Sequence, residues 1–394
     1  MRGTKRSWLP LLLLLLLLTL GGCAAQEVQA PETTQAPEAT QAAADLTWDT
    51  LAFDHRMALS YAEQFTVDSC EGGYQKITIG DTDTYLVIPE GAETPEGIPE
   101  QVTVIKQPLD SIYLVATSAM DLFRQLDAMD AVRLSGTDAS GWYIPEAKQA
   151  MESGKMRYAG KYSAPDYERI VSEGCDLAVE STMIYHTPEV KEQLERFGIP
   201  VLVERSSYES HPLGRMEWIK LYGALLGKEE AAEAFFDRQL DLLSPVLEQE
   251  NTGKMVAFFY ITSNGAVNIR KSGDYIAKCI QLAGGVYLPQ GLTEENALST
   301  MTVQMETFYQ QARDADILIY NSTIDGELQS VEQLLSKSAL LKDFKAVREG
   351  NVWCAGRNLF QESLGLGELI LDIHDILNAE DGEILDLTYL RRLN

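Results

Sequence analysis

From residue 102 onward, short runs rich in β-branched and aromatic residues alternate with stretches of helical spacing. In the first half the predicted strands cover residues 102–105, 112–115, 132–134, 156–160, 177–180 and 199–204, and the predicted helices cover residues 119–129, 145–153, 166–173 and 188–197. Strands that alternate with helices in this way form βαβ units, which build a parallel sheet covered by helices. The pattern predicts an α/β lobe over residues 46–227. Within it, residues 48–100 are expected to form a small antiparallel β extension, with strands at 74–79 and 84–88.

A long helical pattern interrupts this alternation at residues 228–249. It places Phe236, Leu240 and Leu243 at spacings of four and three, which is typical of a helix with one apolar face. At 1.5 Å per residue this helix would be about 30 Å long, the width of a small domain. We expect Pro245 to kink the helix or to end it early, because proline lacks a backbone N–H and its ring collides with the preceding turn.

The alternation then resumes and predicts a second α/β lobe over residues 250–394. Its predicted elements cover residues 255–260, 266–269, 275–283, 303–312, 317–320, 330–344, 352–354 and 367–377. The predicted fold class is therefore α/β, with two lobes of mainly parallel sheet joined by a single long spanning helix. Because one stiff helix joins the lobes, we expect any hinge closure to be small.

The first residues carry the pattern of an export signal. Three basic residues precede an apolar run at residues 11–18, which is too short to span a bilayer comfortably. Residues 20–23, Leu-Gly-Gly-Cys, resemble the lipobox of bacterial lipoproteins, in which the cysteine thiol accepts a diacylglycerol after cleavage. We therefore predict a lipoprotein signal peptide over residues 1–22 and lipidation of Cys23. The alternative is an ordinary secreted protein with a chance cysteine.

Residues 23–45 follow as a stretch rich in Ala, Gln, Glu, Thr and Pro, with almost no large apolar side chain. Such a segment cannot bury enough surface to offset the entropy of ordering, so it is expected to be a flexible tether. A tether between a lipid anchor and a folded domain places the protein at the outer face of the cytoplasmic membrane.

The chain is strongly acidic. Removing residues 1–22 takes away three of its 32 basic residues and none of its 59 acidic ones, so the net charge falls from −27 to −30. This charge argues against nucleic acid as a partner and against docking flat on anionic lipid. Cys70, Cys175, Cys279 and Cys354 are too far apart in sequence to suggest a metal knuckle, and they leave both disulfides and buried free thiols open.

Seven short sequence segments within residues 102–377 follow one another in an order that indicates a protein family. They are Pro165-Asp166-Tyr167-Glu168-Arg169-Ile170, Cys175-Asp176-Leu177-Ala178-Val179, Gly198-Ile199-Pro200-Val201, Leu225-Leu226-Gly227-Lys228-Glu229-Glu230-Ala231-Ala232, Leu282-Ala283-Gly284-Gly285, Asp314-Ala315-Asp316-Ile317-Leu318 and Ala346-Val347-Arg348-Glu349-Gly350-Asn351-Val352. Together, behind a lipobox, they are similar to the substrate-binding proteins of ABC importers for ferric siderophores, haem and cobalamin. The resemblance implies the two-lobed fold of class III periplasmic binding proteins.

The same resemblance implies a function without a covalent step. The protein would capture an iron chelate, a ferric siderophore first of all, and deliver it to an ABC permease and its ATPase in the membrane. Haem or cobalamin is the alternative ligand within this class. The implied protein has no cofactor of its own beyond the bound ligand, and we expect it to be a monomer.

The alternative function outside the class of binding proteins is that of a surface-anchored enzyme or chelatase on the same scaffold, because a fold does not settle function. The sequence contains no Gly-x-Ser-x-Gly elbow, His-Glu-x-x-His motif or phosphate-binding loop. Its four histidines are scattered without the spacing of metal ligands. We therefore expect neither catalytic residues nor a protein-bound metal.

The candidate ligand contacts lie on loops that follow strands, because the cleft of an α/β binding protein opens at strand ends. They are Trp142, Tyr143, Tyr162, Tyr185, Arg205, Tyr208 and His211 in the first lobe, and Tyr260, Asn268, Arg270 and Arg357 in the second. A chain this acidic that keeps arginines on such loops is expected to hold an anionic ligand, since guanidinium grips carboxylate or catecholate oxygens with paired hydrogen bonds. Tyr208 and His211 are alternatively expected to be axial ligands of haem iron.

Two glutamates are candidates for docking to the permease. In the resembling family a glutamate on each lobe meets arginines of the permease, and the matching positions here are Glu168 and Glu306. Each lies near the start of a predicted helix that precedes an apolar strand. The alternative is that each glutamate only stabilises the N-terminus of its own helix through the macrodipole.

Overall fold

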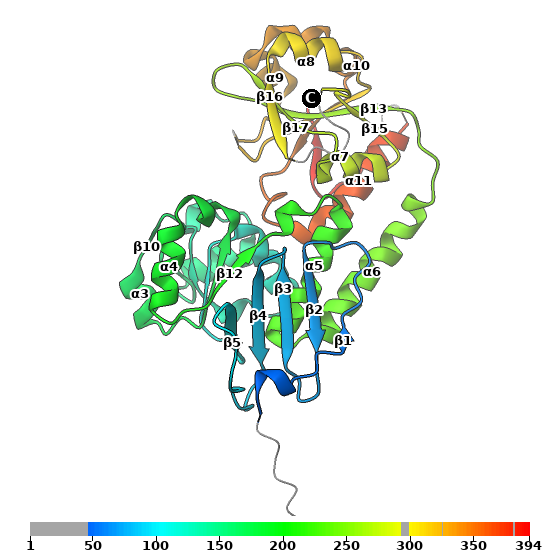
Figure 1. The fold of residues 1–394 in the computed structure, drawn as a ribbon. Helices are drawn as coiled ribbons and strands as arrows, with labels where there is room; N and C mark the ends of the chain where they lie inside the picture. Colours follow the sequence, from blue (N-terminus) through cyan, green and yellow to red (C-terminus); the bar gives the residue numbers. More distant parts are fainter. Residues whose placement is uncertain (1–45, 293–298, 325, 381–382) are drawn as a thin grey trace, which may run out of the picture. The chain divides into compact units, whose positions relative to one another are not determined.

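The computed structural model describes residues 46–292, 299–324, 326–380 and 383–394. The predicted signal peptide, Cys23 and the predicted tether lie outside the described residues. Residues 46–394 form one unit by backbone contacts, built around three larger β-sheets (Figure 1). None of the helices in this described part combines the length and apolar character that a bilayer crossing requires.

The first lobe contains a five-stranded parallel sheet. Its strands are β6 (Ile112–Leu114), β7 (Val132–Ser135), β8 (Arg157–Tyr158), β11 (Leu177–Ser181) and β12 (Val201–Glu204). Its helices are α1 (Met120–Gln125), α2 (Pro145–Glu152), α3 (Tyr167–Ser172) and α4 (Pro188–Arg196). The strand order is β12-β11-β6-β7-β8, and every pairing is parallel. The predicted α/β class is confirmed.

Residues 156–160, predicted as one strand, are divided in the structure. Strand β8 ends at Tyr158, and residues 160–165 form a separate hairpin of β9 (Gly160–Lys161) and β10 (Ala164–Pro165). Gly160 has a φ of +84°, a left-handed conformation that ends the extended run.

The second lobe contains a seven-stranded mixed sheet. Its strands are β13 (Met255–Ile261), β14 (Val267–Arg270), β15 (Val286–Leu288), β16 (Thr300–Val303), β17 (Ile317–Asn321), β18 (Val352–Ala355) and β19 (Leu390–Arg392). Its helices are α7 (Tyr275–Leu282), α8 (Met305–Ala312), α9 (Val331–Lys337) and α10 (Lys345–Glu349). Strands β13, β15, β17 and β18 are parallel, whereas β14, β16 and β19 pair antiparallel to their neighbours.

A third sheet, here called the N-terminal sheet, precedes both lobes. It consists of β1 (His55–Arg56), β2 (Phe65–Ser69), β3 (Gln75–Ile79), β4 (Asp83–Ile88) and β5 (Val102–Lys106), in that order. The sequence predicts a small antiparallel extension over residues 48–100, but β5 also belongs to this sheet and pairs parallel to β4. Only five residues separate β5 from β6, too few for the crossover that would let these two strands pair in parallel.

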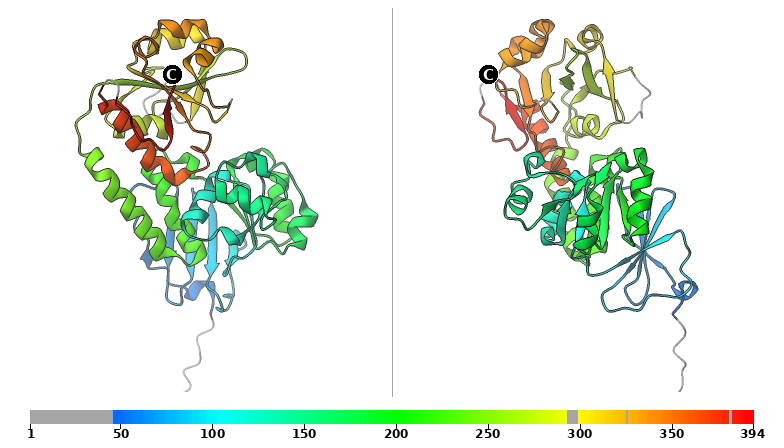
Figure 2. Two further views of the ribbon diagram at one scale, coloured as in Figure 1. Left: turned by 180° about the vertical axis from the view of Figure 1, so that it is seen from behind. Right: turned by 90° about the vertical axis from the view of Figure 1, so that its left-hand side faces the viewer.

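One helix carries the chain from the first lobe to the second, α6 (Glu229–Leu247), and two others pack against it, α5 (Pro212–Leu226) and α11 (Leu366–Asn378). Helix α6 is the predicted spanning helix, and it contains Pro245 and ends two residues later at Leu247. Helix α11 comes from the second lobe and packs against α5, α6 and α7 (Figure 2). The single spanning helix predicted from the sequence is therefore confirmed, and α5 and α11 pack beside it.

The largest apolar core passes through all three sheets. It includes Phe65 of β2, Leu114 of β6, Trp218 of α5 and Ile319 of β17, all at most 3% exposed. Because one continuous core joins these elements, the N-terminal sheet is packed into the protein rather than appended to its surface.

Candidate functional site

The loops after β11 and β12 bring three predicted ligand residues together. Tyr185 lies in the 3-10 helix Thr182–His186 that follows β11, and Tyr208 ends the 3-10 helix Ser206–Tyr208 that follows β12. Arg205 joins β12 to that second turn, and its Cζ lies 5.1 Å from the centre of the Tyr208 ring. Strands β11 and β12 are parallel neighbours, so their carboxyl ends meet at one edge of the sheet. We call Tyr185, Arg205 and Tyr208 the arginine–tyrosine cluster.

The arginine–tyrosine cluster combines exposed rings with a cation that lacks an ion-pair partner among the described residues. Tyr185 is 47% exposed and Tyr208 is 43% exposed. Burial and then Asp83 raise the pKa of Tyr185, whereas Arg205 lowers it, so the guanidinium is within electrostatic reach of this phenol. Among the described residues, no carboxylate forms a salt bridge with Arg205, and its buried Nε has no hydrogen-bond partner. Such a guanidinium is available for an anionic ligand.

A second contact joins predicted residues of the two lobes. Arg357, in the loop after β18, places its Cζ 4.6 Å from the centre of the Tyr143 ring, in the loop before α2. The Tyr143 N–H donates to Oε1 of Gln361 over 2.7 Å, and Nε2 of Gln361 donates to the carbonyl of Gly141 over 2.7 Å. These bonds hold residues 141–143 against the second lobe.

Arg270 is held by groups of the protein itself. Its side chain is 13% exposed and its Nη1 lies 3.5 Å from Oδ2 of Asp274. Its Cζ lies 5.6 Å from the centre of the Tyr275 ring, and Cζ of Arg215 in α5 lies 3.9 Å from the same ring. Two guanidinium groups, one from each lobe, therefore share one phenol. A ligand contact of Arg270 stays a prediction.

His211 occupies a different environment from Tyr208. It is the N-cap of α5, and its Nδ1 accepts a hydrogen bond of 3.2 Å from the Leu213 N–H. Its ring stacks on Tyr61 with centres 4.8 Å apart. Burial, and secondly the charge of Lys278, lower the pKa of His211 to about 4, so the imidazole is neutral at pH 7. Within the described residues, no ring contact joins Tyr208 to His211.

The four remaining candidates lie apart from the arginine–tyrosine cluster in the structure's contacts, and only Tyr260 and Asn268 among them are neighbours. Trp142 is 2% exposed, and its Nε1 donates to Oγ of Ser135, so a ligand could touch the indole only after it was uncovered. Tyr162 is half-buried in the turn between β9 and β10. Tyr260 and Asn268 face each other across the β13–β14 pair, and both are half-buried. Their contacts with a ligand stay predictions.

Comparison with known families decides what kind of scaffold carries these residues. Residues 116–358, more than half of the chain, match the model of the periplasmic binding protein family. The chain belongs to the periplasmic binding protein family. This match confirms the family predicted from the seven sequence segments.

Similar proteins include uncharacterized lipoproteins and solved ligand-binding proteins. Two uncharacterized lipoproteins of Methanocaldococcus jannaschii are each 23% identical, one over 72% of this chain and 69% of its own length, the other over 74% and 75%. A periplasmic heme-binding protein of Vibrio cholerae, HutB, superposes with a TM-score of 0.54 at 16% identity, covering 67% of this chain and 98% of its own. The petrobactin-binding protein YclQ of Bacillus subtilis gives 0.55 at 13% identity, covering 70% and 94%. At these identities the solved structures establish the fold alone.

The two predicted docking glutamates occupy equivalent places in this periplasmic binding protein. Glu168 lies in the first turn of α3 and Glu306 in the first turn of α8, and both are exposed. Helix α3 precedes β11 and helix α8 precedes β17, as expected from the sequence. Their role in docking stays a prediction.

Three residues that the sequence did not single out take part in the contacts around the candidate site. They are Tyr61, which stacks on His211, Arg215, which packs on Tyr275, and Gln361, which bonds residues 141–143. The sequence could have pointed to Arg215, because it is a charged residue within the apolar run of α5. The sequence contains no such indication for Tyr61 and Gln361, because their contact partners lie far away in the chain.

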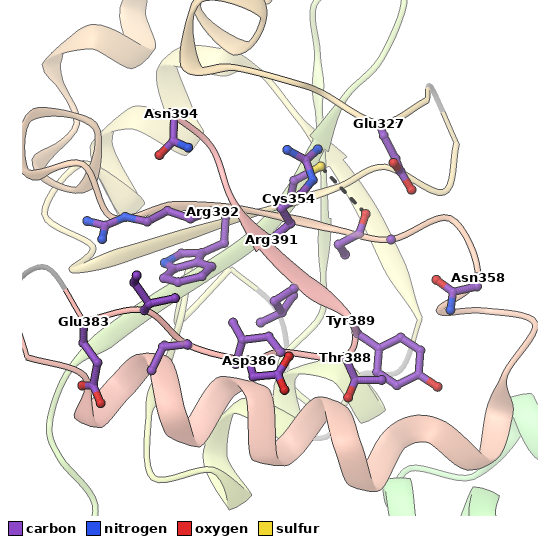
Figure 3. A pocket seen from close by; sticks show the side chains of 17 residues that line it. Glu327, Cys354, Asn358, Glu383, Asp386, Thr388, Tyr389, Arg391, Arg392 and Asn394 are labelled. Atoms are coloured by element: carbon purple, nitrogen blue, oxygen red, sulfur yellow. Dashed lines mark hydrogen bonds between the residues drawn. The ribbon is translucent and has the colours of Figure 1, made fainter.

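A cavity of about 710 Å³ lies beside β18 and β19 of the second lobe (Figure 3). One end of it is lined by Glu327, Gly356 and Asn358, which follow the carboxyl ends of β17 and β18, and the other extends to Asn394. None of the eleven predicted ligand residues lines this cavity. The cavity is therefore separate from the arginine–tyrosine cluster.

Side chains that commonly bind metals are dispersed over the protein. Within the described ranges, no group of three or more His, Cys, Asp or Glu side chains is placed to hold a metal ion. Cys70, Cys175, Cys279 and Cys354 are all free thiols, and all but Cys175 are buried.

Proposed function

We propose that this protein is the lipid-anchored, extracytoplasmic binding component of an ABC importer, and that it captures an anionic ferric chelate of the siderophore type. The observation that supports this most directly is the guanidinium of Arg205, which has no salt-bridge partner among the described residues, beside the exposed rings of Tyr185 and Tyr208. Guanidinium N–H groups can donate to catecholate or carboxylate oxygens, and aromatic rings can pack against a flat chelate. The family match, and the names of solved relatives that bind heme and petrobactin, support an iron complex as the ligand.

Delivery would be to a membrane permease with its ATPase, and the protein would act as a monomer. We propose no chemical step, because the family consists of binding proteins. A turnover assay separates this proposal from the enzyme or chelatase alternative. Catalytic consumption of the chelate, together with normal uptake in a deletion strain, would contradict the binding function.

Haem is the alternative ligand, but the surroundings of Tyr208 and His211 favour a siderophore. Two axial ligands must approach one iron from opposite sides, whereas Tyr208 contacts Arg205 and His211 stacks on Tyr61. Titration with haem, monitored by its Soret absorption, tests this alternative, and titration with cobalamin by fluorescence tests the corrinoid.

We expect Arg205→Ala to weaken binding of an anionic ferric chelate by about 1.5–3 kcal/mol, roughly 10- to 150-fold, because charge-assisted hydrogen bonds would be lost. Arg357→Ala should act in the same direction, since Arg357 also lies over an aromatic ring on a strand-end loop. Quenching of intrinsic fluorescence measures both, with Trp142 next to Tyr143 as the reporter.

The matched control for these arginine variants is Arg196→Ala, which removes an exposed guanidinium from the last turn of α4. Its affinity should equal that of the wild type. Unchanged affinity in both Arg205→Ala and Arg357→Ala would leave these arginines as structural groups and would favour a neutral or tetrapyrrole ligand.

The anchor has its own test. We expect Cys23→Ala to prevent lipid attachment and cleavage at the preceding bond, because the thiol is the proposed acceptor. The related proteins named as lipoproteins support this assignment. Metabolic labelling with a fatty acid and membrane fractionation measure the effect. A variant that still incorporates the label and fractionates with membranes would refute lipidation at Cys23.

A further inference from the structure

The N-terminal sheet lies outside the matched family segment. Its five strands fall within residues 55–106, whereas the family model begins at residue 116. The solved relatives are covered over 94% or more of their own lengths but leave about three tenths of this chain unmatched. The sheet nevertheless reaches the loop that carries Arg205, by two separate sets of contacts.

The first set consists of two buried carboxylates that bind the chain just before β2. Glu209 is 3% exposed, and its Oε1 accepts from the N–H of Gln64 over 2.9 Å and from Nε1 of Trp218 over 2.9 Å. Glu217 is fully buried, and its Oε2 accepts from the N–H groups of Tyr61 and Ala62 over 2.8 and 2.9 Å. Charge-assisted bonds of this kind are stronger than neutral ones. They fix residues 60–62 against α5 and residues 63–64 against the loop that follows β12.

The second set is a close approach between the β3–β4 turn and Arg205. Gly80 has a φ of +59°, and its N–H donates to the carbonyl of Gln64 over 2.7 Å. A Cβ placed on Gly80 would lie 2.9 Å from Cζ of Arg205 and closer still to Nη1. Real Cβ atoms essentially never come this near, so a side chain at position 80 would displace the guanidinium. Asp83, at the start of β4, is within electrostatic reach of Tyr185.

We infer that the N-terminal sheet is part of the ligand site, and that its Gly80 turn positions the Arg205 guanidinium for the anionic groups of the chelate. The inference rests on the proposed function and adds a specificity element to it. Arg205 extends from the first lobe, contacts the Tyr208 ring and packs on the backbone of Gly80. Its orientation is therefore set by a segment that the matched family model does not include. Gly80 acts through Arg205 and is a positioning residue.

The test replaces Gly80 by alanine and measures affinity for a ferric tris-catecholate, which is anionic, and for a ferric tris-hydroxamate, which carries no such negative charge. We expect Gly80→Ala to weaken the tris-catecholate by about tenfold or more, because displacement of the guanidinium loses a charge-assisted bond. The tris-hydroxamate should change much less. The matched control is Gly91→Ala, since Gly91 also has a positive φ, +77°, in the same sheet region, but a Cβ added there would have no atom within 4 Å.

Two further measurements keep the test decisive if Gly80→Ala folds poorly. Gly80→Asn carries a residue that tolerates the left-handed conformation but still collides with the guanidinium. In an Arg205→Ala background, Gly80→Ala should have no further effect on affinity, because its partner is already absent. If Gly80→Ala only destabilised the fold, it would weaken binding further in the Arg205→Ala background and would lower the melting temperature.

The outcomes separate the inference from the proposed function. If the wild type binds the tris-catecholate and Gly80→Ala or Gly80→Asn binds it equally well, the inference is overturned and the proposed function stands. If the wild type binds no anionic chelate, the proposed function fails and the inference fails with it. The inference is supported if the Gly80 variants lose affinity, Gly91→Ala does not, and Gly80→Ala causes no further loss in a protein that already carries Arg205→Ala.

Discussion

A protein that carries both Glu168→Arg and Glu306→Arg should bind its chelate normally and yet support no uptake. Both side chains are exposed, and each lies in the first turn of a helix, α3 in the first lobe and α8 in the second. Neither belongs to the arginine–tyrosine cluster. Like charges placed against a basic permease surface repel, and such pairs act mainly on orientation and encounter rate. Uptake of radiolabelled iron by a deletion strain that expresses the variant measures the effect.

The control for this charge reversal is Glu192→Arg with Glu349→Arg, which changes the net charge equally at exposed positions on α4 and α10. It should support normal uptake. If the Glu168 and Glu306 variant folds, binds and imports like the wild type, the docking role is refuted and each glutamate serves only its own helix N-terminus. If that variant instead loses the chelate, these residues belong to the ligand site.

Much of the fold follows from the sequence because its elements have strong local patterns. The predicted helices at 145–153 and 188–197 correspond to α2 and α4, each of which begins with a proline. The spanning helix at 228–249 corresponds to α6, whose apolar side chains recur at helical spacing. In these segments, local preference and tertiary packing agree.

The sequence pattern does not predict helix α5, and the burial of this helix explains why. Thirteen of its 15 residues are buried, so its apolar side chains surround the helix instead of forming one face. The periodicity that identifies a surface helix is then absent. The pattern also places strand β5 in the wrong sheet for a related reason, because a short apolar run does not specify which neighbour it pairs with.

The candidate site was predictable where parallel strands bring their own loops together. Tyr185 and Arg205 follow the neighbouring strands β11 and β12, so strand-end reasoning places them side by side. The contacts that orient Arg205 were not predictable, because Gly80 lies 125 positions earlier in a sheet outside the family pattern. Sequence reasoning also could not separate Arg205, which lacks an ion-pair partner among the described residues, from Arg270, which is held by Asp274.

Replacing Glu180 by glutamine should stabilise the protein strongly in alkaline solution and hardly at all in acid. Glu180 lies in β11 and is fully buried, and neither oxygen of its carboxyl group has a hydrogen-bond partner in the described structure. Burial raises the pKa of Glu180 to about 8. An unpaired carboxylate in such a place is costly, because nothing replaces the water that it has lost.

The sign of the effect follows from proton binding. Below about pH 4.5 the Glu180 carboxyl is protonated in the folded and in the unfolded chain, so Glu180→Gln should change the free energy of unfolding little. Between pH 4.5 and about 8 the unfolded chain releases this proton and the folded one keeps it, so wild-type stability falls by about 1.4 kcal/mol per pH unit from this group. Above the pKa of Glu180 in the folded protein, the difference in free energy of unfolding between the two proteins becomes constant. Glu180→Gln is then more stable than the wild type by on the order of 5 kcal/mol.

Urea denaturation of both proteins from pH 4 to pH 9 measures this difference directly. Other buried carboxyl groups, such as Glu204 and Asp121, also have raised pKa values because of burial, but they are common to both proteins and cancel in the comparison. The matched control is Glu192→Gln on α4, an exposed position at which the same substitution should change stability by less than about 0.5 kcal/mol at every pH. If the extra stability of Glu180→Gln over the wild type did not grow between pH 5 and pH 8, the Glu180 carboxyl would have to be ionised and paired in the folded protein. That result would contradict the buried position without a hydrogen-bond partner that the described structure gives this side chain.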